Sequence, residues 1–236
     1  MFLEEKNKTP DLYGELYSDF RVTGTPFLAY RDLPEILSKY ASGKDALDYG
    51  SGSGETSFFL KSLGYNVVGV DINDRMLTAL RQRDPGGQYL KIDSAKIPSD
   101  NETYDLVVCA FVLLEIATKD EILKVVSEIR RVLKKGGIFI SILTNDNTYK
   151  HDWLTLNTSF PENKNLTSGS KVKVEFRDLG FAIDDYYWTE NDYKEIFQKA
   201  GFVISEIHKP IGREDDGYEW SDEKNFPPIT IFVCKG

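Results

Sequence analysis

A glycine-rich turn follows the first strand-like run of the chain and has the residue types needed to hold a charged ligand. Residues 47–55 read Leu-Asp-Tyr-Gly-Ser-Gly-Ser-Gly-Glu, so that Gly50, Gly52 and Gly54 alternate with serines such as Ser51. Glycines let a backbone approach a ligand with no Cβ in the way. The helix expected to follow presents unpaired N–H groups to an anion. The turn therefore predicts a ligand site, and a glycine turn without a ligand is the alternative.

The acidic residue Asp48, two positions before Gly50, distinguishes between two kinds of ligand. Dinucleotide-binding turns have the spacing GxGxxG and hold a pyrophosphate, whereas this turn has the spacing GxGxG. A carboxylate at Asp48 would repel a pyrophosphate, but it suits a ligand with an ammonium and a carboxylate group. The methionyl part of S-adenosylmethionine (SAM) is such a ligand. An NAD(P)-dependent oxidoreductase is the alternative that fits the expected fold but not the glycine spacing.

Two more acidic residues fall where neighbouring strands are expected to end. Asp71 closes the run 66–70, at the place where an acid meets ribose hydroxyls in proteins of this topology. Its alternative role is a helix N-cap. Asp93 follows the run 88–92, where an acidic side chain can accept a hydrogen bond from an adenine amino group, with a plain surface turn as the alternative.

The elements that must position these residues alternate along the chain. Apolar strands separated by amphipathic helices are typical of a doubly wound, mostly parallel α/β sheet, which binds its ligand beyond the carboxyl ends of the strands. Strands are predicted over residues 45–49, 66–70, 88–92, 106–110, 138–143, 202–208 and 229–234. Helices are predicted over residues 11–20, 26–40, 55–62, 73–83, 119–133 and 189–200, with 134–137 ending the fifth of them.

The alternation stops after residue 144. The stretch 145–188 is longer than an ordinary connection between a strand and a helix, and residues 171–176 and 183–188 within it are strand-like. We expect a small antiparallel cap here. The chain is thus predicted to form one domain over 1–236, consisting of a helical lid (1–43), a ligand-binding core (44–144), the substrate cap (145–188) and the completion of the sheet (189–236).

The composition of the chain favours a soluble globular protein and disfavours one that binds nucleic acid. The 236 residues are 41% hydrophobic and 28% charged, and their formal net charge is −9. Nucleic acid is an unexpected partner for so acidic a chain, because nucleic-acid affinity depends on lysines and arginines that neutralise phosphates. Cys109 and Cys234 lie in apolar runs and are expected to be buried free thiols rather than metal ligands. With no signal peptide or membrane-length apolar run, a soluble cytoplasmic protein is expected.

Taken in the order in which they occur along the chain, the glycine-rich turn and the motifs that follow it resemble those of the class I SAM-dependent methyltransferases. The resemblance covers residues 44–144 and rests on the turn 48–54, Asp71, the turn 93–95, the run 105–110 and the segment 133–137. It implies a Rossmann-like methyltransferase fold with a seven-stranded sheet. It also implies SAM as cofactor, S-adenosylhomocysteine as its product, and no metal.

The resemblance also implies individual roles. The glycine turn would bind the methionine portion of SAM, Asp71 the ribose, and Ala110 and Phe111 would lie near the sulfonium. Ile72, Met76 and the turn 93–95 would meet the adenine. An N-terminal tyrosine would fold over the cofactor. The implied cofactor-binding residues are Tyr17, Asp48, Gly50, Ser51, Gly52, Gly54, Asp71, Ile72, Met76, Asp93, Ser94, Ala95, Ala110 and Phe111.

The two ends of the chain narrow the resemblance further. Residues 185–190 and 219–228 look like the toxoflavin-synthase-like branch of small-molecule methyltransferases, which implies a nitrogen acceptor in a modest-sized metabolite. The chain departs from many relatives at Leu114-Glu115, where a histidine is frequent. A SAM-binding protein without chemistry is an alternative that fits every cofactor motif.

Candidates for the acceptor side follow the fifth strand. His151 is the candidate base because its unperturbed pKa, about 6.5, is near neutrality. A solvated surface histidine is the alternative. Asn145, Tyr187 and Trp188 are the candidate acceptor contacts, and a packed core of the cap is the alternative for the two aromatic residues.

Overall fold

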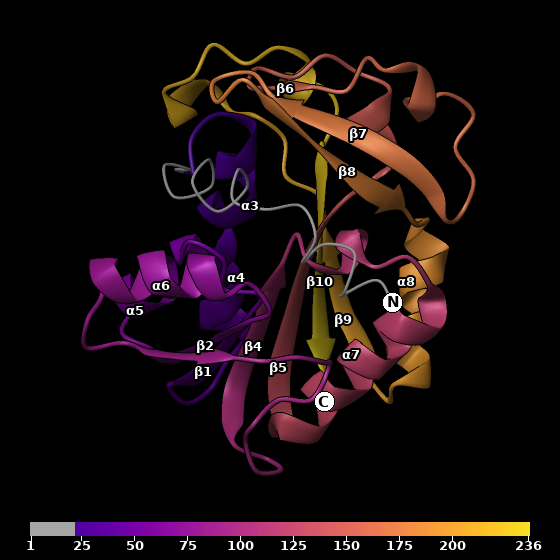
Figure 1. Ribbon diagram of the computed structural model, residues 1–236. Coiled ribbons are helices and arrows are strands. Elements are labelled where there is room, and N and C mark those ends of the chain that lie inside the picture. Colours follow the sequence, from indigo (N-terminus) through magenta and orange to yellow (C-terminus); the bar gives the residue numbers. More distant parts are fainter. Residues whose placement is uncertain (1–21) are drawn as a thin grey trace.

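A seven-stranded sheet forms the centre of the protein in the computed structural model, which describes residues 22–236 (Figure 1). The strand order is β3-β2-β1-β4-β5-β10-β9, and β10 alone runs antiparallel to both of its neighbours, β5 and β9. The predicted mostly parallel seven-stranded sheet is confirmed. Its strands are β1 (Asp45–Tyr49), β2 (Asn66–Asp71), β3 (Gln88–Lys91), β4 (Tyr104–Ala110), β5 (Leu133–Thr144), β9 (Val203–His208) and β10 (Ile229–Lys235).

Helices cover both faces of the sheet because the inner strands are apolar on both sides. In β4, Val107 and Cys109 face the layer that contains α7 and α8, whereas Leu106 and Val108 face the layer that contains α3 and α4. All four side chains are fully buried. The α-helices are α3 (Leu28–Arg31), α4 (Leu33–Tyr40), α5 (Glu55–Ser62), α6 (Asp74–Arg83), α7 (Lys119–Val132) and α8 (Glu190–Lys199).

The helix predicted over residues 26–40 is wrong as a single element. The structure has a 3-10 turn, η1 (Thr25–Phe27), followed by α3 and then α4, which begins after Asp32. Pro34 lies in the first turn of α4 and has no N–H to donate back to the preceding turn, so the helix restarts there. Asp32 at the break is buried and accepts hydrogen bonds from Arg31 and His208.

The predicted helix over residues 119–133 is confirmed as α7, which ends at Val132, but the segment predicted to terminate it is assigned wrongly. β5 begins at Leu133, directly after α7, so residues 134–137 belong to the strand rather than to a turn before it. Leu133 pairs with Tyr104, and the register then shifts before Ile138 pairs with Leu106. Gly136 has a φ of +76° in this irregularity, a backbone conformation that glycine adopts without strain.

Residues 145–188 contain the predicted antiparallel cap. A three-stranded sheet with the order β6-β7-β8 is built from β6 (Leu156–Asn157), β7 (Ser170–Phe176) and β8 (Phe181–Tyr187). The first of these strands has only two residues, too few for an alternating pattern to reveal. Figure 1 shows this sheet above the end of the large sheet at which β4 and β5 finish. The cap therefore lies on the side where a ligand of the large sheet is expected.

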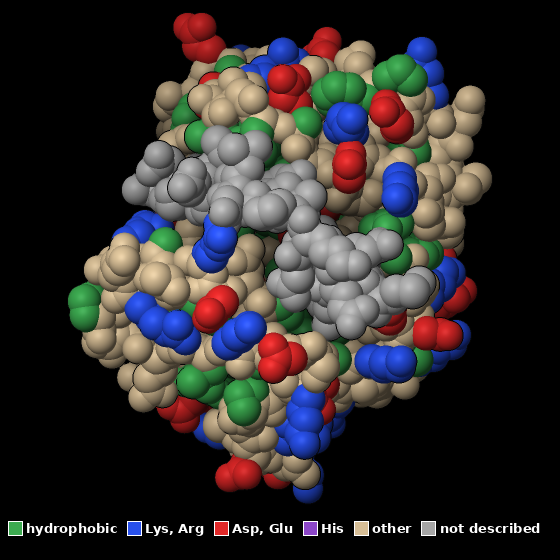
Figure 2. Space-filling view, viewed as in Figure 1, with side chains coloured by type: hydrophobic (Ala, Val, Ile, Leu, Met, Phe, Trp, Pro, Cys, Tyr) green, Lys and Arg blue, Asp and Glu red, His purple; other side chains and the backbone are tan. Residues whose placement is uncertain are grey.

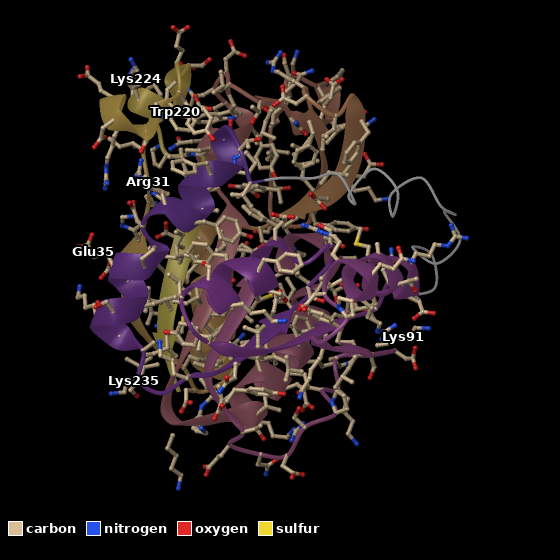
Figure 3. The ribbon with its side chains drawn as sticks, turned by 90° about the vertical axis from the view of Figure 1, so that its left-hand side faces the viewer. Arg31, Glu35, Lys91, Trp220, Lys224 and Lys235 are labelled. Carbon is tan, nitrogen blue, oxygen red and sulfur yellow. The ribbon has the colours of Figure 1, made fainter. Side chains whose placement is uncertain are left out.

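A long connection between β9 and β10, which we call the tail loop (residues 209–228), runs beside the cap and α3. The indole Nε1 of Trp220 and the guanidinium of Arg31 both donate to Asp216 Oδ2, over 3.1 and 2.7 Å. Figure 3 shows Arg31 and Trp220 close together where α3 meets this loop. The contact joins two segments that lie 185 residues apart in the sequence.

Two of the sequence predictions lie outside the described residues: the helix over residues 11–20 and Tyr17, the proposed lid residue. Within residues 22–236, no helix is long and apolar enough to cross a membrane. The same described range contains no cluster of three or more histidine, cysteine or acidic side chains arranged to hold a metal ion.

Glu223 in the tail loop is fully buried and connects three segments. Its Oε1 accepts from Thr25 Oγ1 over 2.7 Å and from the Leu154 amide over 2.8 Å, and its Oε2 accepts from the Ser221 amide over 3.0 Å. Glu223→Ala leaves the buried Thr25 hydroxyl and the two amides without this acceptor, so we expect a loss of about 2–4 kcal/mol in unfolding free energy. The midpoint of thermal unfolding should fall by roughly 5–15 °C.

Glu219→Ala is the matched control, because Glu219 is exposed in the same loop. Its unfolding midpoint should stay within about 2 °C of the wild type. Equal midpoints for the two variants in differential scanning calorimetry would contradict the role given to Glu223.

Candidate functional site

The glycine-rich turn between β1 and α5 is tied to the end of β2. The amides of Gly50 and Ser51 both donate to the Val70 carbonyl, over 2.8 and 3.0 Å. Gly50 has a φ of +79°, and a Cβ there would come within 2.2 Å of Val112 Cγ2. A Cβ on Gly52, in contrast, would meet only two atoms of the described part of the chain, Met76 Sδ at 3.5 Å and a backbone oxygen at 4.0 Å. The described residues therefore leave no room for a side chain at Gly50, whereas the turn is open to a further atom at Gly52.

Asp48, the acid before this turn, is buried beside it, with 1% of its surface exposed. Its Oδ2 accepts from Ser57 Oγ over 2.6 Å, while its Oδ1 has no hydrogen-bond partner within the described residues. Burial raises the pKa of Asp48 to about 7, the Ser57 hydroxyl lowers it, and the charge of Asp71 raises it further. A buried carboxylate oxygen without a donor is costly unless a ligand supplies one.

Asp71 at the end of β2 holds the turn by both of its oxygens. The Gly52 amide donates to Oδ2 over 2.7 Å, and the Asn73 amide donates to Oδ1 over 2.7 Å. Burial raises the pKa of Asp71 to about 6 against the lowering effect of these two bonds. The N-cap of α6 is Asn73, whose Oδ1 accepts from the Met76 amide over 3.3 Å. Asn73, two residues further along the chain, therefore takes the N-cap position that was the alternative role for Asp71.

The end of β4 lies against the same turn. Phe111 has a φ of +58° and donates its amide to the Ile142 carbonyl over 2.9 Å. A non-glycine residue in this region carries strain of about 1–3 kcal/mol and persists only where its surroundings fix it. The next residue, Val112, is the one that contacts Gly50. The structure therefore brings together Gly50, Asp71 and the Ala110–Phe111 corner, which the sequence placed in one site.

The turn after β3, residues 93–95, differs from the glycine-rich turn because its acidic side chain is exposed. The Asp93 side chain is 89% exposed and lies 3.6 Å from Lys91 Nζ. Ser94 Oγ accepts from the Lys96 amide over 3.2 Å, and Ala95 is half-buried against the core. The carboxylate of Asp93 thus points to solvent, and its contact with adenine stays a prediction. Ile72 and Met76 are half-buried, and Met76 lies beside Gly52.

His151 lies where the cap meets the tail loop. Its ring stacks on Phe226 with centroids 3.6 Å apart, and its Nδ1 is 3.6 Å from Asp222 Oδ2. Its edge contact with Trp153 also lies within the cap. The side chain is 22% exposed, which is less than a solvated surface histidine would be, and a role as base stays a prediction.

The three proposed acceptor contacts have structural partners of their own. The amide nitrogen of Asn145 donates to Pro227 O and Thr230 Oγ1, and its Oδ1 accepts from the Asn147 amide. Tyr187 donates to Asp146 Oδ1 over 2.5 Å, and Trp188 Nε1 donates to Ile116 O over 3.1 Å. Both aromatic side chains are 7% exposed. The packed-core alternative describes their position, and acceptor contact stays a prediction.

Sequence reasoning did not select two residues that the structure makes prominent. Ser57, one turn into α5, is the donor to Asp48. Asp185 in β8 is 3% exposed, although it is an acid in a strand with a second acid beside it. Alternation along β8 could have found it, because Asp185 shares a face with Ile183 and Tyr187.

Comparisons with known proteins relate this chain to methyltransferases. Residues 47–141 match the family model of a methyltransferase domain. A ribosomal protein L11 methyltransferase of Dictyoglomus turgidum is 39% identical over 111 residues, which is 45% of this chain and 35% of that relative. N-demethylindolmycin N-methyltransferase of Streptomyces griseus is 27% identical over 179 residues, which is 73% of this chain and 75% of that relative. The chain thus spans only about a third of the length of the first relative.

A solved SAM-dependent methyltransferase of Clostridium acetobutylicum has the same fold, with a TM-score of 0.64 at 17% identity over 98% of both chains. The family match identifies residues 47–141 as a methyltransferase domain, and the structural likeness shows the Rossmann-like methyltransferase fold. The family that these findings support is the class I SAM-dependent methyltransferases.

The raised pKa of Asp48 predicts how stability depends on pH. A carboxyl group that titrates near 3.9 in the unfolded chain and near 7 in the fold takes up a proton on folding between these values. Its contribution to stability is therefore present at low pH and lost as the pH rises towards 7. Asp48→Asn should remove up to about 1.4 kcal/mol per pH unit of this dependence. Urea unfolding at pH 5, 6, 7 and 8 measures it.

Asp100→Asn is the control for this measurement, because Asp100 is exposed. Its slope should equal that of the wild type. If Asp48→Asn also keeps the wild-type slope, the carboxyl group is not buried as described.

Proposed function

We propose that this protein transfers the methyl group of SAM to a nitrogen atom of a small-molecule acceptor. The observation that carries the proposal is the buried Asp48 Oδ1, which lacks a donor within residues 22–236 and lies beside a glycine turn that is open at Gly52. An ammonium group on the ligand would supply that donor. A pyrophosphate would be repelled by the same carboxylate. The chemistry of the donor set therefore fits SAM and argues against NAD(P).

The residues that would hold SAM lie at the carboxyl ends of β1, β2 and β4. Asp48 would bind the ammonium, the turn 50–54 the methionyl carboxylate, and Asp71 the ribose hydroxyls in addition to its two backbone donors. Ile72 and Met76 would contact the adenine, with the turn 93–95 at its far side. The corner at Ala110–Phe111 would border the sulfonium. We propose that the chain is one methyltransferase domain, in which residues 145–188 cover the acceptor.

SAM supplies both the electrophilic methyl group and the departing sulfur, so no metal and no side-chain nucleophile enters the proposal. The task left to the protein is to hold the acceptor nitrogen in line with the carbon–sulfur bond and to exclude water. The small sheet of the cap, with its buried aromatic core of Tyr149, Trp153 and Tyr187, suits the exclusion of water.

Three observations support a small nitrogen acceptor. The relative that aligns over 73% of this chain is by name an N-methyltransferase of a small molecule. The net charge of −9 disfavours nucleic acid. Figure 2 shows Lys and Arg side chains interspersed with Asp and Glu over the visible part of one face. The segments 185–190 and 219–228 further suggest the toxoflavin-synthase-like branch as the nearest group of enzymes.

Asp71→Ala should weaken SAM binding about 10- to 100-fold, because hydrogen bonds to a charged group are worth about 1.5–3 kcal/mol. Isothermal titration calorimetry with SAM and with NAD measures this. The wild type should bind SAM in the low-micromolar range or tighter, at roughly −8 kcal/mol, and should not bind NAD. NAD binding, or unchanged SAM affinity in Asp71→Ala, would overturn the assignment. The exposed variant Asp100→Ala should bind SAM as the wild type does.

The variant Gly52→Ala tests whether the open side of the turn binds SAM, because its effect on SAM affinity can be compared with its effect on stability. Among residues 22–236, no atom lies closer than 3.5 Å to a Cβ built on Gly52, so this Cβ would extend into the open side of the turn. We expect SAM affinity to fall at least ~10-fold, with a stability loss of only ~1–2 kcal/mol from the left-handed conformation. Gly64→Ala is the matched control, because Gly64 also has a positive φ, +80°, with nothing within 4 Å of its Cβ position. Thermal unfolding should rank the two variants equally, and calorimetry with SAM should separate them. Equal SAM affinity in both would show that the open side of Gly52 is not the ligand surface.

A further inference from the structure

Arg83, the last residue of α6, holds the second half of the glycine-rich turn. Its Nη1 donates to the Ser53 carbonyl over 2.6 Å, and its Nη2 donates to Glu55 Oε1 over 3.1 Å. Its guanidinium carbon also lies 4.7 Å from the centre of the Phe58 ring. One side chain of α6 therefore contacts both the turn and the first residues of α5, the helix next to α6 in Figure 1.

α6 contacts the turn at a second place. Gly54 has a φ of +98°, and a Cβ there would come within 2.3 Å of Leu80 Cδ1. Ser53 is 7% exposed, so its carbonyl needs a donor from the protein. The Arg83 guanidinium is that donor, and a charged donor forms a stronger hydrogen bond than a neutral one. The position of this half of the turn is therefore set by α6.

The peptide between Gly52 and Ser53 is held at both of its ends. The last amide of the turn 51–54 donates to its first carbonyl over 2.7 Å, which places these two residues at the centre of the turn. The Gly52 amide donates to Asp71 Oδ2 on one side, and the Ser53 carbonyl accepts from Arg83 on the other. Among residues 22–236, the Ser53 amide itself has no acceptor, so it is available to a ligand.

The amino-acid end of SAM depends on the orientation of this peptide more than the nucleoside end does. The proposed function assigns the methionyl carboxylate to the turn 50–54, whereas Asp71, Ile72 and Met76 would bind the adenosine portion. A hydrogen bond from a backbone amide weakens steeply when the amide turns away from its acceptor. Loss of the contact at the Ser53 carbonyl should therefore affect the carboxylate and leave the adenosine in place.

We infer that Arg83 is a positioning residue of the cofactor site. By holding the Ser53 carbonyl, it presents the adjoining amides of the turn to the carboxylate of the methionyl group. This inference rests on the proposed function, because it concerns the SAM site proposed above. Arg83 acts through the turn, so binding of the amino-acid end of SAM requires it and binding of the adenosine end does not.

The test compares two ligands that share the adenosine and the sulfur atom, each titrated into the full chain by calorimetry. S-adenosylhomocysteine has the amino-acid portion, whereas methylthioadenosine lacks it. Arg83→Met should weaken the binding of S-adenosylhomocysteine about 10-fold and leave methylthioadenosine within about 2-fold of the wild type. A merely structural role for Arg83 would change both affinities together or neither.

Arg81→Met is the matched control. Arg81 lies in the same helix and also donates to a backbone carbonyl, that of Tyr89, over 2.9 Å. The control variant therefore removes the same charge and the same kind of bond at a place outside the turn. Both ligands should bind it within about 2-fold of the wild type. A loss of S-adenosylhomocysteine affinity equal to that of Arg83→Met would overturn the inference.

The outcomes separate this inference from the proposed function. A wild type that binds neither ligand would contradict the proposed function, and the inference with it. Wild-type binding of both ligands, with unchanged S-adenosylhomocysteine affinity in Arg83→Met or with equal losses for the two ligands, would overturn the role of Arg83 alone.

A crystal structure of the wild type with S-adenosylhomocysteine decides the question even where Arg83→Met does not fold. The Ser53 carbonyl should remain bonded to Arg83 while the turn contacts the carboxylate of the ligand. A Ser53 carbonyl that is released from Arg83 and turned toward the ligand would overturn the inference.

Discussion

Two carboxylates, Asp48 and Asp71, are buried at the ends of neighbouring parallel strands, and the cofactor side of the molecule is organised around their charges. The parallel register of β1 and β2 sets Asp48 opposite Gly69 and brings Asp71 one residue beyond the end of β1. Asp71 is compensated by two backbone amides, whereas Asp48 accepts from Ser57 and its Oδ1 has no hydrogen-bond partner among the described residues. Two like charges in a poorly solvated place raise each other's pKa, and a cationic ligand relieves this repulsion.

The turn between the two acids depends on tertiary contacts as much as on its glycines. The Val70 carbonyl, the Asp71 carboxylate and Val112 fix it from three sides. Val112 is held there because Phe111 takes a left-handed conformation and donates to Ile142 in β5. The strain at Phe111 is tolerated because β4 and β5 are paired from Leu106 to Ala110, directly before it, and Phe111 itself donates to Ile142 in β5. Four parallel strands thus cooperate to shape one short turn.

The proposed acceptor side belongs to a different part of the chain. The buried Glu223 of the tail loop accepts from Thr25 in η1 and from the Leu154 amide in the cap, and so links these three segments. This construction separates the two halves of the proposed reaction. The large sheet would hold the cofactor, and the inserted small sheet would choose the acceptor, which is how one fold supports many substrates.

The sequence by itself determined most of the elements, the parallel sheet and the glycine-rich turn, because these follow from local periodicity and from glycine spacing. It also placed Asp71 at the end of the second strand, where this topology predicts a ribose contact, and that role stays a prediction. It misjudged the helix over residues 26–40 and the start of β5, where Pro34 and a register shift against β4 change the local preference.

Only the tertiary structure decided which polar groups are buried and which partners they have. Asp93 and Asp185 are both acids next to strand-like runs, yet one is solvated and the other lies in an apolar layer. His151 drew attention by its chemistry, but stacking on Phe226, 75 residues further along the chain, places it between cap and tail loop. The burial of a polar side chain and the partners of its hydrogen bonds depend on residues distant in the sequence. A local sequence pattern therefore cannot predict them.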